Sequence, residues 1–264
     1  MTARTSSPVD IPRIAPPSAA VFESDFVKAS RPVILRGAIA DWPAMTKWSL
    51  DYFKESFGDR ELPVVREKDG VPYDAASGLH YERIRFGDYC DLIADDEPHD
   101  LFITVRVDEQ LPELFDDIRQ PVYTADTPWA RSRFWLNAPD TKGPLHRDLP
   151  ENLYAQIAGR KQFLLLDRRH TRMVYRHPFY SGVPNYSPVD AENPDLARFP
   201  RFRGAPLLRA VVEPGDLLFI PSLWWHQAHS LSTTMSINLW WLRGPMVAVA
   251  RLAEVYMRMR GLNL

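Results

Sequence analysis

Cysteine and long apolar runs are scarce in this sequence. Cys90 is the only cysteine among 264 residues, so the chain cannot form an internal disulfide, and a reducing compartment is expected. No apolar stretch approaches the roughly 18 residues that a membrane helix needs. Residues 1–9 lack the basic and then apolar pattern of a signal peptide. We therefore expect a cytoplasmic protein without a membrane anchor.

A strong charge of one sign is also missing. The formal net charge is −2, whereas a nucleic-acid-binding protein usually carries a strongly basic surface. Nucleic acid is therefore an unexpected partner, although one local basic patch could overturn this expectation. Glycine is scarce beside proline, with 12 glycines against 24 prolines. Because proline cannot donate a hydrogen bond within a sheet, this balance favours many strand ends and turns.

Short strands separated by turns dominate the sequence from Phe134 to Trp241. Evenly spaced strands around a loop-rich centre, here residues 171–208, are typical of a double-stranded β-helix, the jelly-roll barrel of cupins. The expected fold class is therefore mainly β with flanking helices. We divide the chain into a flexible N-terminal arm, a barrel domain and a C-terminal helix, at 1–18, 19–245 and 246–264. Further helices are expected at 18–30, 49–57 and 86–94.

Three residues of this barrel have the character of iron ligands. His146 and Asp148 are two positions apart in a strand-like context, and side chains at i and i+2 share one face of a strand. One imidazole and one carboxylate are two-thirds of the facial triad of non-haem iron(II) oxygenases. His226, at the end of the run IPSLWWHQ, is the best candidate for the third ligand. Each residue alone also has an ordinary explanation, as a solvated surface pair or a hydrogen-bonded core histidine.

Two runs around these residues carry a likeness to a known family. They are GPLHRDLPENLYAQIAGRKQFLLL (143–166) and PGDLLFIPSLWWHQAHSL (214–231), followed by SINLWW (236–241). The runs resemble the Jumonji-C hydroxylases, including the arginyl C3-hydroxylase and the factor-inhibiting-HIF asparaginyl hydroxylase. The likeness begins at RPVILRGAIADWPAMTKWSLDYF (31–53) and covers most of the chain. It implies a hydroxylase that uses iron(II), 2-oxoglutarate and O2.

The resemblance also implies roles for individual residues. His146, Asp148 and His226 match the iron ligands of the family. Lys161 matches the lysine that pairs with the distal carboxylate of 2-oxoglutarate through a charge-assisted bond. The remaining matches are Asn152, Asn238 and Trp240 near the cosubstrate, and Trp135 in the substrate pocket. Without the resemblance, the lysine would face solvent, the asparagines would satisfy buried backbone groups, and the tryptophans would be core residues.

Two positions depart from the family pattern. Relatives usually place Ser or Thr three residues before the first ligand, in contact with the cosubstrate, and here that position is Gly143. Thr141 is the candidate replacement. The arginyl hydroxylase contacts its substrate through an acidic residue, and the corresponding position here is Val65. An arginine substrate is therefore not expected, and histidine, asparagine or lysine in a basic peptide ranks ahead of it.

The expected substrate is a side chain of a peptide or protein. A small molecule or a modified RNA nucleoside is the alternative, and a non-catalytic cupin is the third possibility. Residues 171–206 and 95–117 are expected to wall a substrate groove, where the acidic side chains of the second segment either steer a cationic peptide or form a solvated surface. The apolar stripe of the C-terminal helix favours a homodimer, unless that helix packs on its own barrel.

Overall fold

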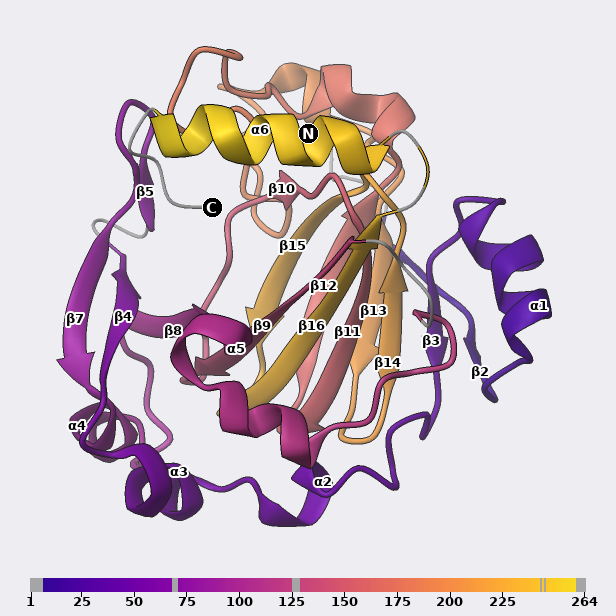
Figure 1. The fold of residues 1–264 in the computed structure, drawn as a ribbon. Coiled ribbons are helices and arrows are strands. Elements are labelled where there is room, and N and C mark those ends of the chain that lie inside the picture. Colours follow the sequence, from indigo (N-terminus) through magenta and orange to yellow (C-terminus); the bar gives the residue numbers. More distant parts are fainter. Residues whose placement is uncertain (1–6, 68–70, 125–128, 243, 245, 260–264) are drawn as a thin grey trace.

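Two β-sheets pack against one another and form the body of the molecule (Figure 1). The computed structural model describes residues 7–67, 71–124, 129–242, 244 and 246–259. The smaller sheet has five strands in the order β1 (Val9–Asp10), β13 (Leu208–Val212), β12 (Lys161–Leu166), β15 (Trp225–Ser230) and β10 (His146–Arg147).

The larger sheet has nine strands. Their order is β2 (Arg13–Ile14), β3 (Val33–Leu35), β14 (Leu217–Ile220), β11 (Glu151–Ala158), β16 (Thr234–Leu242), β9 (Trp129–Asn137), β8 (Leu101–Arg106), β4 (Glu61–Arg66) and β7 (Tyr81–Arg85). A separate hairpin joins β5 (Tyr73–Asp74) to β6 (Gly78–Leu79). Strands from the second half of the chain occupy both sheets, which is the arrangement of a jelly roll, so the predicted fold class is confirmed.

Alternation along the strands separates the barrel interior from its outer faces. On β12, Phe163 and Leu165 belong to a cluster with Tyr154 of β11, between the two sheets. Leu164, between them, packs outward against the long loop that follows β12. Lys161 lies two positions before Phe163, so it shares the inner face of β12. The strand pattern thus directs a charged side chain into the barrel.

Helices cover the outer face of the larger sheet. They are α1 (Ala19–Phe22) continuing into the π-helical turn η1 (Glu23–Val27), α2 (Ala44–Lys47), α3 (Leu50–Phe57) and α4 (Phe86–Leu92). The short α5 (Val107–Gln110) leads into the 3-10 turn η2 (Pro112–Asp117), and two further 3-10 turns, η3 (Arg168–Met173) and η4 (Pro200–Phe202), lie in the long loop. Ser49 caps α3, as its sequence predicts, because its hydroxyl accepts from the backbone N–H of Tyr52 at 3.0 Å.

The predicted loose arm at 1–18 is wrong for the residues from 7 onward. β1 pairs in parallel with β13, and β2 pairs in parallel with β3. Both partners would otherwise be edge strands with unpaired backbone groups, so a proline-punctuated segment that supplies two short strands stabilises both sheets. Asp10 adds a 2.6 Å ion pair with Arg209. Residues 1–6 lie outside the described part of the chain.

The predicted C-terminal helix is present as α6 (Met246–Met259). Figure 1 places it at the opposite end of the sheets from α2 and α3, the same end as β10. Ala250 is buried, whereas Val249, Leu252 and Val255 are 47%, 71% and 55% exposed, so an apolar stripe is left uncovered. The homodimer stays a prediction, and the expected cap at Gly261 lies outside the described residues. Among the residues described, no helix is both long and apolar enough to cross a membrane.

Phe134 is expected to be a main support of the fold. Its ring lies between Phe53 of α3, at 5.0 Å, and Trp48, at 5.5 Å, and it is fully buried. Replacing it with alanine leaves a cavity, so Phe134→Ala should lower the free energy of unfolding by about 3–5 kcal/mol in urea titrations. Phe179→Ala is the matched control because Phe179 is 78% exposed, and it should change stability by less than about 0.5 kcal/mol. Equal effects of the two changes would contradict this packing.

Candidate metal centre

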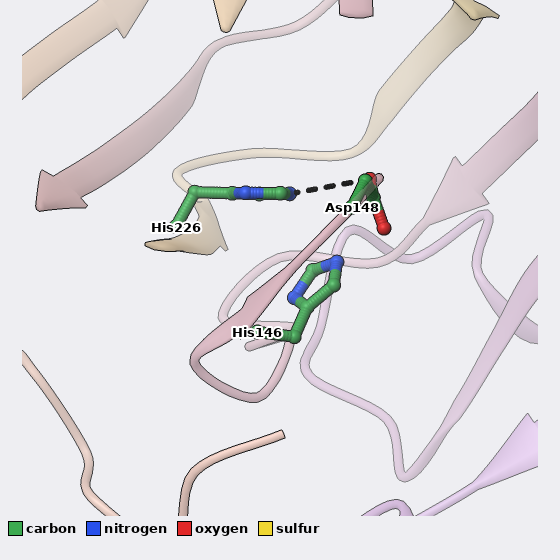
Figure 2. A group of neighbouring side chains, drawn as sticks. All are labelled: His146, Asp148 and His226. Atoms are coloured by element: carbon green, nitrogen blue, oxygen red, sulfur yellow. Dashed lines mark ion pairs between the residues drawn. The ribbon is translucent and has the colours of Figure 1, made fainter. Parts of the chain in front are cut away.

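Two histidines face one another across the short ladder between β10 and β15. His146 is the direct partner of His226 in this antiparallel pairing, and their ring centroids are 4.2 Å apart. Oδ2 of Asp148 lies 3.7 Å from Nε2 of His226. One potential ligand atom from each of the three residues lies within 4.8 Å of the others, and Figure 2 shows the three side chains converging. The structure thus brings together the trio that the sequence suggested.

The donor atoms of this trio suit a divalent metal ion. Nδ1 of His146 lies 2.8 Å from the carbonyl oxygen of Pro144, and Nδ1 of His226 lies 3.1 Å from that of Trp224. A carbonyl can only accept, so each Nδ1 carries a proton and each neutral ring has its lone pair on Nε2. Burial is the main cause that lowers the pKa of His226 to about 4. This ring is therefore neutral at physiological pH.

Asp148 completes the fit. Its Oδ2 is buried and has no hydrogen-bond partner among the described residues. A buried carboxylate oxygen without a donor is unfavourable unless a cation satisfies it. Two neutral imidazole nitrogens and one carboxylate oxygen form the ligand set that is characteristic of non-haem iron(II). The residues present therefore fit an iron ion.

The loop after β14 fixes the carboxylate end of the cluster. The backbone N–H of Leu223 donates to the carbonyl of Asp148 at 2.7 Å, and the Ser222 hydroxyl donates to the carbonyl of Leu149 at 2.5 Å. Leu223 has a φ of 63°, a left-handed conformation that a branched side chain adopts only at a free-energy cost. This unfavourable conformation occurs at the residue whose backbone N–H binds the Asp148 carbonyl.

The long loop also supports the ligand strand from its other edge. Tyr186 forms a β-bridge with His146, and the backbone N–H of Ser187 donates to Leu145 at 2.9 Å. The ring of Tyr186 meets the His146 ring edge-on, with centroids 5.4 Å apart. Burial is the main cause that raises the pKa of the Tyr186 phenol, so it stays neutral. The sequence did not single out Tyr186, since no motif marks it within the loop.

Lys161 lies deeper in the barrel than the three potential ligands. In the β12–β15 ladder, Lys161 of β12 pairs with Ser230 of β15, whereas Leu165 of β12 pairs with His226 of β15. The side chain of Lys161 is 4% exposed, and its Nζ donates to Oδ1 of Asn137 at 3.0 Å. No carboxylate forms an ion pair with it in the described part of the chain, and burial lowers its pKa to about 7. A buried ammonium with a neutral partner is prepared for an anion that the protein itself does not supply.

The other predicted site residues divide into two groups. Asn152 and Asn238 are buried and bonded to each other, Nδ2 of Asn238 donating to Oδ1 of Asn152 at 2.7 Å. Trp135 and Trp240 share the inner face of the larger sheet, and both indole N–H groups are buried without an acceptor among the described residues. The tryptophans are thus available to a ligand, while the asparagines bond to one another. Asn137, missed by the sequence analysis, lies two positions after Trp135 and so shares its face.

Three residues were singled out because the sequence departs from the family pattern: Thr141, Gly143 and Val65. The Thr141 hydroxyl donates to the carbonyl of Ala138 at 2.8 Å, so its proton is used to close its own turn. A Cβ on Gly143 would meet nothing nearer than the Ala228 carbonyl oxygen at 3.9 Å, so packing alone does not demand glycine there. Val65 is fully buried on β4 opposite Tyr81 and Phe102.

Asp148→Ala should weaken metal binding while the fold is kept. Loss of the single anionic ligand leaves two neutral imidazoles, so the affinity for Mn(II) or Fe(II) in calorimetric titration should fall by at least about tenfold to a hundredfold, the size of effects seen for outer-shell partners alone. Asp140→Ala is the control because Asp140 lies outside the cluster, 3.2 Å from His229. A metal affinity equal to that of the unmodified protein would show that Asp148 is not a ligand.

Comparison with known proteins agrees with this geometry. The model of the cupin-like domain family matches residues 18–245. A zebrafish protein named lysine-specific demethylase 8 is 34% identical over 243 residues, which cover 88% of this chain and 58% of the relative. A human bifunctional peptidase and (3S)-lysyl hydroxylase is 29% identical over 274 residues, covering 89% and 84%. The human tRNA wybutosine-synthesizing protein 5 is 28% identical over 256 residues, covering 89% and 78%.

The chain spans little more than half the length of the zebrafish demethylase. Two further relatives are named for a Jumonji-C domain, the Jumonji C domain-containing protein 5 of Drosophila melanogaster and the JmjC domain-containing protein D of Dictyostelium discoideum. The expected Jumonji-C resemblance is confirmed by these matches. With its jelly-roll sheets and its histidine and aspartate cluster, the chain belongs to the cupin-like domain family of Jumonji-C proteins.

Proposed function

We propose that this protein is an iron(II)- and 2-oxoglutarate-dependent oxygenase that hydroxylates a side chain of a peptide or protein. The observation that carries the proposal is the pairing of His146 with His226 beside Asp148, with the buried ammonium of Lys161 on the same barrel interior. When bound, iron and 2-oxoglutarate supply the activation of O2 that allows one oxygen atom to enter a C–H bond. The protein supplies position, charge and shelter from water.

Each residue of the site has a defined task in this proposal. His146, Asp148 and His226 would hold the metal ion. Lys161 would bind the distal carboxylate of 2-oxoglutarate. Trp135 and Trp240 line the interior, and their indole N–H groups, which have no acceptor among the described residues, would be available to the bound molecules. No residue has to act as a general base, because the residues that surround the metal only bind and orient.

A peptide or protein is favoured over the other substrate classes by the relatives whose names state a protein or amino-acid residue as substrate. A modified RNA nucleoside remains the second candidate, since one relative is named for the synthesis of wybutosine in tRNA. A non-catalytic cupin is the weakest reading, because it gives no role to an unsatisfied carboxylate oxygen beside two oriented imidazoles.

Mass spectrometry tests the proposed function. The protein is incubated with Fe(II), ascorbate, 2-oxoglutarate and a panel of peptides, and with free nucleosides and amino acids in parallel. We expect a gain of one oxygen atom on a peptide and formation of succinate. The Asp148→Ala protein is the negative control. Oxidation of nucleosides or free amino acids alone would exclude the peptide assignment, and absence of succinate under all conditions would exclude the enzyme.

Lys161 should control cosubstrate affinity and make it depend on pH. A charge-assisted bond to a buried carboxylate contributes about 1.5–3 kcal/mol, so Lys161→Ala should weaken 2-oxoglutarate binding about tenfold to a hundredfold. Because its pKa is lowered to about 7 and the anion binds the protonated form, affinity should fall as pH rises above 7, by at most about tenfold per unit. Lys161→Arg should remove this dependence, since guanidinium stays protonated. A flat profile in the unmodified protein would place the carboxylate elsewhere.

A further inference from the structure

One arginine on the inner face of the barrel lacks an anionic partner. Arg133 lies on β9 two positions before Trp135, while Phe134 between them packs outward in the helix-covered core. Its guanidinium makes only long contacts, 3.4 Å from Nη1 to the carbonyl oxygen and to the hydroxyl of Thr104. Within the described part of the chain, no carboxylate forms an ion pair with it. Most of its five donors are therefore available to a ligand.

The neighbours of Arg133 make this arrangement costly without a ligand. Arg133 stands directly opposite Arg106 in the β8–β9 ladder, and like charges at paired positions destabilise a sheet. Arg106 forms ion pairs with Asp108 and Glu109, whereas Arg133 forms none with the residues that the structure describes. The guanidinium of Arg133 also lies 6.0 Å from the ring of Trp240, whose indole N–H has no acceptor among the residues that the structure describes. This wall of the barrel offers donors and lacks acceptors.

Arg133 lies close to the metal centre. The phenol of Tyr186, which packs against His146, is within the electrostatic influence of both Asp148 and Arg133. Arg147 of β10 alternates with His146 and Asp148, so it lies on the outer face, where it stacks on Trp225 at 5.2 Å. On the inner face, Arg133 is therefore a cationic group beside the candidate metal centre.

The cosubstrate does not account for Arg133. Lys161 contacts Asn137, four positions from Arg133 along β9, and four residues of a strand span roughly 13 Å. The carboxylates of 2-oxoglutarate are separated by four C–C bonds, about 5–6 Å at ordinary bond lengths. The distal carboxylate bound at Lys161 is therefore remote from Arg133, and the other carboxylate would be neutralised by the metal. The anion proposed for Arg133 is a carboxylate of a separate molecule.

Most carboxylates of the acidic segment 95–117, which was expected to attract a cationic peptide, are already paired. They contact basic residues of the same molecule, for example Asp100 with Arg66, Glu113 with Arg60 and Asp117 with Lys47. Glu67 is a part-buried carboxylate with one unpaired oxygen. The backbone N–H of Glu67 donates to the carbonyl oxygen of Asp100. Asp100 lies six positions before Arg106, the β8 partner of Arg133, which corresponds to roughly 20 Å of extended chain. Glu67 cannot neutralise the arginine.

We propose that Arg133 binds a carboxylate side chain of the substrate, so that the substrate is an acidic peptide segment with Asp or Glu near the hydroxylated residue. This inference rests on the proposed function. The proposed charge of the peptide is opposite to the basic context that the sequence suggested, because most acidic side chains of residues 95–117 form ion pairs within the fold. Arg133 is a specificity-determining residue.

Peptide binding tests this inference separately from turnover. Fluorescent peptides of one length carry a central Asn, His or Lys among alanines, with Asp, Asn or Lys at each flanking position in turn. Their affinities for the Mn(II)- and 2-oxoglutarate-loaded full chain are measured by anisotropy without O2. At one or more positions, Asp should bind about tenfold to a hundredfold more tightly than its isosteric partner Asn. Arg133→Gln should abolish this difference, and Arg133→Lys should keep part of it.

Arg85→Gln is the matched control because Arg85 is exposed and paired with Asp59 far along the edge strand β7, and it should leave the preference intact. The proposal would be overturned if Asp and Asn peptides bound equally, if Lys peptides bound more tightly, or if no peptide bound. A preference for Asp that survives in Arg133→Gln would overturn it as well. A loss of 2-oxoglutarate affinity in Arg133→Gln would instead assign the arginine to the cosubstrate. Peptide-independent succinate formation by the same preparation reports the proposed function, so its failure is recognised separately.

Discussion

The antiparallel pairing of β10 with β15 is the constraint on which the site depends. β10 has only two residues, yet this ladder sets His146 opposite His226. A shift of β10 by one residue would turn the His146 imidazole to the outer face, away from His226, because side chains alternate along a strand. Such a short strand does not hold its register alone. It is fixed on one edge by β15 and on the other by the bridge to Tyr186, with the Leu223 turn holding the Asp148 backbone.

The barrel interior contains polar groups that an ordinary core would exclude. Lys161 is buried with an amide as its partner, Oδ2 of Asp148 has none, and two indole N–H groups have none in the described part of the structure. Each unsatisfied buried group lowers stability by about 1–3 kcal/mol. The hydrophobic cluster between the helices and the larger sheet supplies the compensating burial. The fold is stabilised on one face of the larger sheet and left incomplete on the other, where ligands would bind.

Much of this architecture could be predicted from the sequence, for identifiable reasons. Alternation and turn residues gave the strands after residue 134, and the i, i+2 spacing of His146 and Asp148 put both on one face. The pairing of β1 with β13 and of β2 with β3 was missed, because two-residue strands leave no periodicity to detect. Tyr186 was missed because its role depends on where a long loop returns, which no local pattern records. Asn137 was recoverable, since it alternates with Trp135 on a recognised strand.

The local charge of the site also shows why composition was a poor guide to the partner. A net charge of −2 and an acidic segment both favoured a cationic ligand. In the folded chain, however, Asp108 and Glu109 cover Arg106, and Asp100 covers Arg66. Paired surface charges contribute little field at a distance. What a ligand meets is the charge that the fold leaves unpaired, and next to the candidate metal centre Arg133 carries such a charge among the described residues. An acidic chain can therefore present a cationic site, and the sign is set by tertiary pairing and not by the count of residues.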